Sequence, residues 1–138
     1  MKKVEDYIKK NRDLFILKEN QSDNSISNAE DKLKFKFDTD YKEYLKKFGL
    51  ISFKSMEVFG IGVKDNSHLS VVKNTLDAKN EENNFPDNSV VLEYIGESNY
   101  VIYTMNKGVY QYSSNSLSFI TDNLEKYLLM RFDEVASL

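Results

Sequence analysis

The side chain best suited to acid–base chemistry in this chain is His68, the only histidine among 138 residues. It follows Asp65 and Ser67 closely, so the three residue types of a hydrolase triad occur within one polar run. Catalytic triads, however, are assembled from distant parts of a fold and are recognised by their geometry. We therefore interpret the run as a surface turn that carries an exposed histidine, and we predict that the chain is not an enzyme.

Residues that could bind a metal ion or a phosphate group are also few. Without cysteine and with one histidine, the chain could offer only an all-oxygen metal site. Asp38 and Asp40 have the spacing that opens a calcium loop, but the glycine and final glutamate of such a loop are missing. Gly60-Ile61-Gly62 lacks the third glycine of a dinucleotide loop and the Lys-Ser/Thr pair of a P-loop. We expect no metal and no cofactor.

Composition and length predict one soluble domain that spans residues 1–138. The chain is 41% hydrophobic and 30% charged, with one proline and five glycines, which is typical of a regular globular protein. Its N-terminus has no apolar signal region, and no apolar run approaches the ~20 residues that a membrane span requires. We expect a cytoplasmic protein that does not enter a membrane.

Charge is distributed unevenly along the chain. The net charge is +2 through Gly60 and −5 from Ile61 onward. The acidic residues concentrate between Asp77 and Glu97, where Lys79 is the only basic residue. Such a surface disfavours nucleic acid and favours a basic protein partner. The alternative is a solvated face that keeps the domain soluble.

The helices are predicted from apolar residues that recur with helical spacing. Ser27 and Glu30 fit a capping box at the start of one helix, and Asp38 or Thr39 fits the cap of the next. The next helix has one apolar stripe, formed by Tyr41, Tyr44, Leu45 and Phe48, and ends at Gly49. Further helices are predicted at residues 3–11, at 69–79 with Val72, Leu76 and Lys79 aligned, and after Thr121 with Leu124, Leu128 and Phe132 buried.

Four runs of β-branched and aromatic residues in the last third of the chain predict successive strands. Short turns separate them, so we expect an antiparallel meander. The expected strands are residues 90–95, 100–105, 109–112 and 117–120, and two short strands are expected earlier, at 51–53 and 56–61. The order predicts the α+β class, a single domain with a mixed, mostly antiparallel sheet and helices packed on one face.

The segment from Glu30 to Gly49 also resembles the N-terminal signature of the SUKH superfamily, the Smi/Knr-type proteins. The matching positions are Glu30, Leu33, Phe37, Asp40, Tyr41, Lys42, Tyr44, Leu45 and Gly49. Two positions depart from the signature, because Lys34 stands where glycine is frequent and Asp38 where proline is frequent. Val71-Val72-x-x-Thr75 and Gly108-Val109-Tyr110-x-Tyr112 are similar to later family motifs.

The resemblance implies an immunity protein that binds and neutralises a cognate protein toxin, often a nuclease, by stoichiometric binding. The alternative within the family is a regulatory scaffold that binds a host protein, and an unrecognised enzyme is a third reading. We expect a monomer or weak homodimer. The partner is expected on the acidic, tyrosine-bearing surface, and strand alternation places Glu93 on one face with Val91, Ile95 and Glu97. The expected contact residues are Glu81, Glu82, Asp87, Glu93, Glu97, Tyr100 and Tyr103.

Overall fold

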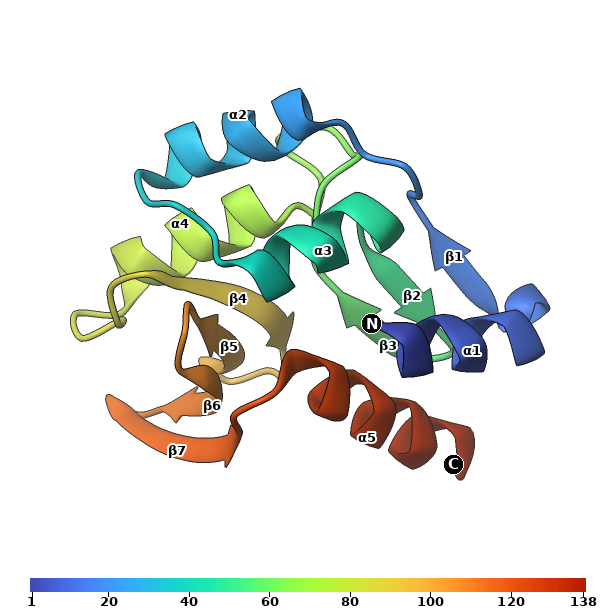
Figure 1. Ribbon diagram of the computed structural model, residues 1–138. Coiled ribbons are helices and arrows are strands. Elements are labelled where there is room, and N and C mark those ends of the chain that lie inside the picture. The colour runs from blue at the N-terminus through green and yellow to red at the C-terminus, as the bar shows by residue number, and fades with distance from the viewer.

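The computed structural model describes all residues, 1–138, and has the α+β architecture expected from the sequence (Figure 1). Its helices are α1 (Lys2–Lys10), a 3-10 helix (Arg12–Leu14), α2 (Asp23–Leu33), α3 (Thr39–Phe48), α4 (Val71–Glu81) and α5 (Leu124–Ala136). Its strands are β1 (Phe15–Leu17), β2 (Ile51–Phe53), β3 (Met56–Val58), β4 (Ser89–Tyr94), β5 (Asn99–Thr104), β6 (Gly108–Ser113) and β7 (Ser116–Thr121). None of the helices combines the length and the apolar composition that crossing a bilayer requires.

The strands divide between two antiparallel sheets. One sheet has the order β1-β2-β3, and the other is the predicted meander, β4-β5-β6-β7. The sheets meet where the Phe59 N–H donates to the Leu92 carbonyl at 2.9 Å, just beyond the end of β3. Helix α4 packs along β4, while α5 lies against β6, β7 and α1 (Figure 1). One continuous apolar core therefore joins both sheets.

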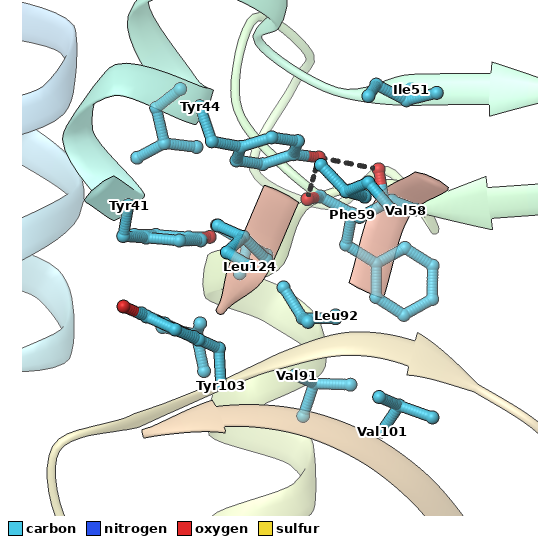
Figure 2. Packing of buried hydrophobic residues seen from close by; sticks show 14 of the residues in the cluster. Tyr41, Tyr44, Ile51, Val58, Phe59, Val91, Leu92, Val101, Tyr103 and Leu124 are labelled. Atoms are coloured by element: carbon cyan, nitrogen blue, oxygen red, sulfur yellow. Dashed lines mark hydrogen bonds between the residues drawn. The ribbon is translucent and has the colours of Figure 1, made fainter. Parts of the chain in front are cut away.

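The centre of that core is built by the predicted stripe of α3 (Figure 2). Tyr41, Tyr44 and Leu45 are fully buried, and Phe48 is 3% exposed. The Tyr44 hydroxyl lies 2.8 Å from the Phe59 carbonyl oxygen and 3.1 Å from that of Val58, so its one polar atom is satisfied inside the core. The Asp38 side chain accepts from the Tyr41 N–H at 2.9 Å and caps the helix, as predicted.

The predicted capping box at Ser27 is wrong. Helix α2 is capped five residues earlier, where the Ser22 hydroxyl accepts from the Ser25 N–H at 3.0 Å. Glu30, the other half of the predicted box, is buried and accepts from the Phe37 N–H at 2.7 Å. Its carboxylate thus holds the turn between α2 and α3.

Two other helix predictions need correction. The N-cap of α5 is Asn123, which accepts from the Lys126 N–H at 3.0 Å, and Thr121 instead ends β7. On α4 the buried side is Val71, Val72, Thr75 and Ala78, whereas Leu76 is 39% exposed. The Thr75 hydroxyl accepts from the Val91 N–H at 3.0 Å, so short side chains bring α4 close to the edge of β4.

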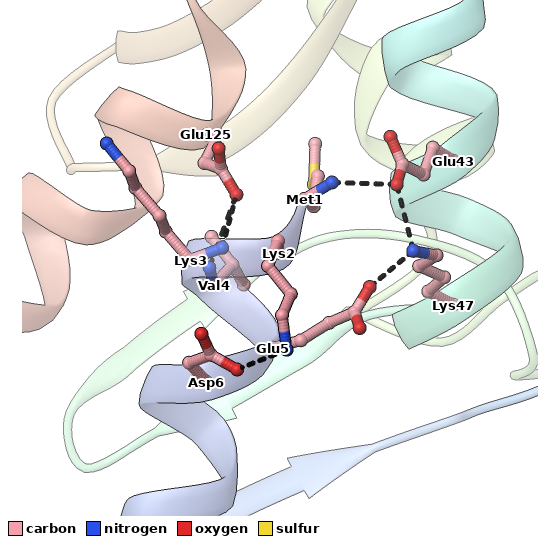
Figure 3. A network of polar contacts seen from close by, with 9 residues as sticks. All are labelled: Met1, Lys2, Lys3, Val4, Glu5, Asp6, Glu43, Lys47 and Glu125. Atoms are coloured by element: carbon pink, nitrogen blue, oxygen red, sulfur yellow. Dashed lines mark hydrogen bonds and ion pairs between the residues drawn. The ribbon is translucent and has the colours of Figure 1, made fainter.

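Polar contacts fasten α1 to α3 and α5 (Figure 3). The Met1 ammonium lies 2.7 Å from Glu43 on α3, and Lys47 lies 3.0 Å from the same carboxylate. The Glu125 carboxylate accepts from the Lys3 N–H at 3.0 Å and from the Val4 N–H at 3.3 Å, so it satisfies free donors in the first turn of α1. Helices from three parts of the sequence are thereby held together.

Candidate functional site

A row of tyrosines crosses the meander at the end of β4. Tyr94 pairs with Tyr100 on β5, and Tyr100 pairs with Tyr112 on β6, so the three side chains lie side by side on one face. Their rings are in contact, with centroids 5.2 Å apart for Tyr94 and Tyr100 and 6.2 Å for Tyr100 and Tyr112. Tyr94 is 49% exposed while Tyr100 is 4% exposed. In this row, therefore, only the Tyr94 ring is accessible to a partner, while the rings of Tyr100 and Tyr112 are buried beside it.

Two carboxylates from the end of α4 lie beside this row. Glu81 is exposed, and its Oε2 accepts from the Tyr100 hydroxyl at 3.3 Å. Glu82, which follows α4, is half-buried. Burial raises the pKa of Tyr100 to about 12, and the charges of Glu81 and Glu82 contribute to the same shift. Tyr100 consequently stays protonated and remains a donor to Glu81.

Glu97 lies in the turn between β4 and β5, at the Tyr94 end of the row. Gly96, Glu97 and Ser98 all have positive φ, and the Ser98 N–H donates to the Tyr94 hydroxyl at 3.1 Å. The Glu97 side chain is exposed at this turn. We call Glu81, Glu82, Tyr94, Glu97 and Tyr100 the acidic tyrosine surface. Asp87 is exposed too, but it precedes β4, which begins at Ser89, so it lies beyond the opposite end of the strand from Tyr94.

Glu93 does not belong to this surface, and the predicted face is wrong. Val91 pairs with Ile102 but Glu93 pairs with Val101, so a β-bulge at Leu92 places Val91 and Glu93 on opposite faces. Glu93 is 4% exposed. Its carboxylate accepts from Arg131 Nε and Nη2, both at 2.9 Å, and from the Tyr127 hydroxyl. Glu93 therefore attaches α5 to the sheet and is not available for direct contact with a partner.

Tyr103 also lies away from the acidic tyrosine surface. It is three residues after Tyr100 on β5, so it points to the opposite face, and it is 3% exposed. Its hydroxyl donates to Asp38 at 2.6 Å, and its ring stacks on Tyr41 at 5.9 Å (Figure 2). Burial, then the hydrogen bond to Asp38, raises the pKa of Tyr103 well above its usual range. Tyr103 is a core residue.

The residues around His68 are not assembled into a triad. His68 is exposed and its Nε2 lies 3.4 Å from Glu57. Asp65 pairs with Lys32 at 2.8 Å, and the Ser67 hydroxyl accepts from the Leu69 N–H at 3.1 Å. Each of the three side chains thus contacts a different partner.

The expected contact residues included neither Tyr94, the exposed ring of the row, nor Phe85, which lies beside the row. Phe85 lies in the loop between α4 and β4, with its ring centroid 6.0 Å from that of Tyr112. Its place as the only aromatic residue in the polar run Asn80–Asn88 was a usable signal, because a large apolar side chain gains stability when it is buried. Phe85 positions the loop that carries Glu82 and Asp87.

The comparisons with known proteins identify the family. The sequence model described as SUKH_5, SMI1-KNR4 cell-wall, matches residues 1–133. No curated protein matches significantly. Among solved structures, the crystal structure of a protein from Pseudomonas syringae pv. tomato is 15% identical, with a TM-score of 0.67 over 83% of this chain and 86% of that one. That likeness concerns the fold, and the family model extends over nearly the whole chain. The chain belongs to the SUKH family, of the SMI1-KNR4 type.

Proposed function

We propose that the chain is an immunity protein that binds a cognate protein toxin and neutralises it stoichiometrically, without catalysis. The family is known for binding proteins of the immunity type, which supports the general class. The observation that carries the proposal is the acidic tyrosine surface, because it combines free negative charge with an accessible ring.

The charge of this surface is not neutralised within the chain. Asp77 is paired with Lys73 at 2.7 Å, and Glu93 is paired with Arg131. The carboxylates that take part in no ion pair between Asp77 and Glu97 are Glu81, Glu82, Asp87 and Glu97. Lys79, the only basic residue of the segment, places its ammonium 5.2 Å from the centre of the Phe35 ring. The segment therefore keeps a local field that attracts cations.

A basic toxin surface is the partner that fits this arrangement. Many nuclease toxins are basic, and opposite charge accelerates encounter and selects against wrong partners. Tyrosine is enriched at interfaces because its ring buries apolar area while its hydroxyl bonds to polar groups. We propose that Tyr94 makes the central contact and that Glu81, Glu82 and Glu97 surround it. Asp87 is proposed to extend the contact along β4.

A regulatory scaffold that binds a host protein is the second candidate. The matching family model is described as cell-wall, which favours a cellular partner over a competitor's toxin. The immunity protein and the regulatory scaffold differ in whether they protect a cell from the toxin. An immunity protein rescues growth when the toxin encoded beside it is expressed, whereas a scaffold does not.

The test starts from the genes beside this one: a toxin found there is co-expressed with the chain, and the purified pair is used for kinetic binding measurements. We expect growth rescue, a 1:1 complex and an association rate that falls as salt rises, since screening shortens to ~8 Å near physiological ionic strength. Reversal of charge in Glu81→Lys/Glu97→Lys should slow association at least tenfold. Absence of both rescue and complex formation would refute the immunity function.

A matched control separates the acidic tyrosine surface from net charge. Asp13 and Asp31 are exposed carboxylates outside the surface and form no ion pair, so Asp13→Lys/Asp31→Lys changes the total charge equally. This control should slow association less than twofold. If both double variants slow binding to the same extent, the toxin contacts another surface.

A further inference from the structure

The outer strand of the meander, β7, has one free edge. Figure 1 shows no element beyond it. The opposite edge of the sheet is covered, because the Leu92 carbonyl on β4 accepts from the Phe59 N–H at 2.9 Å and the Val91 N–H donates to Thr75. The sheet is thus closed on the β4 side and open along Ser116–Thr121.

The geometry of the preceding turn shows which backbone groups face outward. Ser113 pairs with Ser116 across a two-residue turn, Ser114-Asn115, in which both residues have positive φ. The residues that flank such a turn form a hydrogen-bonded pair, so Ser116 and Ser118 direct their N–H and C=O groups to β6. The N–H and C=O groups of Leu117 and Phe119 point away from the sheet, and no hydrogen bond outside the sheet uses them.

The side chains of β7 lack the usual protection of an edge. In natural proteins, a charged residue (often lysine) or a proline commonly prevents an edge strand from pairing with another chain. Ser116–Thr121 contains neither. Leu117 is 48% exposed and Phe119 is 61% exposed. The Phe119 ring packs edge-to-face on Tyr110 with centroids 5.5 Å apart, which holds it on the sheet surface.

We propose that β7 pairs with β7 of a second copy of this chain, antiparallel about a two-fold axis at Ser118, so that two meanders form one continuous sheet. In this register Leu117 of each copy lies opposite Phe119 of the other, and the outward N–H and C=O groups of both residues are satisfied. An apolar residue opposite an aromatic one is a favourable cross-strand pair. Ser118 lies opposite itself, where its small side chain fits.

A second copy fits this edge better than the basic partner proposed above. A two-fold axis places a charge that lies close to it near that charge's own image, and an uncharged strand avoids this repulsion. A basic partner would require carboxylates, and those are gathered on the acidic tyrosine surface. One short strand buries well below the ~1,600 Å² of a standard interface, so the dimer is weak and forms at micromolar or higher concentration.

The first test is the mass of the purified chain by sedimentation between ~1 μM and ~1 mM. The expected result is a reversible rise from monomer to dimer. Leu117→Glu/Phe119→Glu and Leu117→Lys/Phe119→Lys should each remain monomeric, because like charges oppose each other across the axis. An equimolar mixture of the two variants should form a heterodimer, which also shows that both variants are folded.

The second test uses the absence of native cysteine to fix the register. Ser118→Cys should form a disulfide-linked dimer under mild oxidation, because its Cβ atoms face each other across the axis. Ser116→Cys is the matched control, since it is also exposed on β7 but would lie about 13 Å from its image. It should cross-link at least tenfold more slowly.

Three results would overturn the proposal: a monomer at every concentration, a dimer that the Glu variant does not weaken, and equal cross-linking of the two cysteine variants. A monomer whose toxin binding is lost in the Glu variant would show that the edge accepts a strand of the toxin instead. If β7 pairs with a second copy, the Leu117→Glu/Phe119→Glu variant should bind the toxin at the wild-type rate. The dimer test therefore does not depend on whether the acidic tyrosine surface binds the toxin.

Discussion

Arg131 donates to both oxygens of Glu93, from Nε to Oε2 and from Nη2 to Oε1, each at 2.9 Å. Tyr127 donates to the same carboxylate from the preceding turn of α5. The side chain of Glu93 is 5% exposed and that of Arg131 is 22% exposed, so the pair is largely withdrawn from water. Hydrogen bonds to Glu93 raise the pKa of Arg131 above its usual range. The pair fixes the angle at which α5 meets the meander.

Removal of the arginine should leave a buried carboxylate without its cation. We expect Arg131→Met to lower the free energy of unfolding by about 3 kcal/mol. Arg131→Lys should restore only part of this loss, because lysine cannot supply two parallel N–H donors. Urea denaturation measures both. Glu134→Gln removes the exposed partner of Arg131 and should cost less than about 1 kcal/mol; a larger cost than that of Arg131→Met would contradict the assignment.

The packing of α3 predicts a second effect on stability. Leu45 is fully buried beneath Tyr41 and Tyr44, so Leu45→Ala should cost about 2–5 kcal/mol through lost contacts and a residual cavity. Lys46→Ala, one position along the same helix, removes an exposed side chain and should cost less than about 1 kcal/mol. Thermal and urea denaturation check the difference. Equal effects would show that the stripe is not the centre of the core.

Glu43 predicts a dependence of stability on pH. Hydrogen bonds from the Met1 ammonium and from Lys47 lower the pKa of Glu43 below its usual value. A carboxyl whose pKa is lower in the folded state stabilises the fold above its unfolded pKa, and that contribution is lost as pH falls through the folded pKa. Glu43→Gln should therefore destabilise the chain at pH 7 and have a smaller effect near pH 3. Urea denaturation across this range is the measurement, and a constant difference would refute the linkage.

His68 provides a prediction of no effect. Because the side chain is exposed and only approaches Glu57, His68→Ala should change the melting temperature by less than about 2 °C. Protection against the co-expressed toxin should also be unchanged. Loss of protection with an intact fold would assign this loop to the partner-binding site or to catalysis.

Local patterns predicted the elements well, and long-range contacts explain most of the corrections. The stripe of α3, the Asp38 cap and the four late strands depend on neighbouring residues, and all are confirmed. Ser22 and Ser27 both offer capping hydroxyls to α2. Ser22 is the cap, and the Glu30 carboxylate, which a capping box at Ser27 would require, accepts instead from the Phe37 N–H seven residues later. Single-element rules cannot detect that contact.

The residues of the candidate site could be predicted only in part, because their exposure also depends on long-range contacts. Glu81 and Glu97 are exposed and Glu82 is half-buried, whereas Tyr100, which was expected to contact the partner, is buried and donates to Glu81. Strict alternation failed at Glu93 because one extra residue at Leu92 reverses the face. Nothing near Leu92 in the sequence marks a bulge, since the partner of Glu93 is an arginine 38 residues further along.

The contact between Glu125 and the first turn of α1 has a consequence for the order in which the chain folds. Its two hydrogen bonds join residues that are separated by 122 and by 121 positions in the sequence. Closing so long a loop costs entropy before any contact compensates for it. On the ribosome, α1 emerges first but cannot be capped until α5 has been synthesised. We therefore expect a nascent chain that lacks α5 to remain loosely packed at its N-terminal end, so that translation and folding finish almost together.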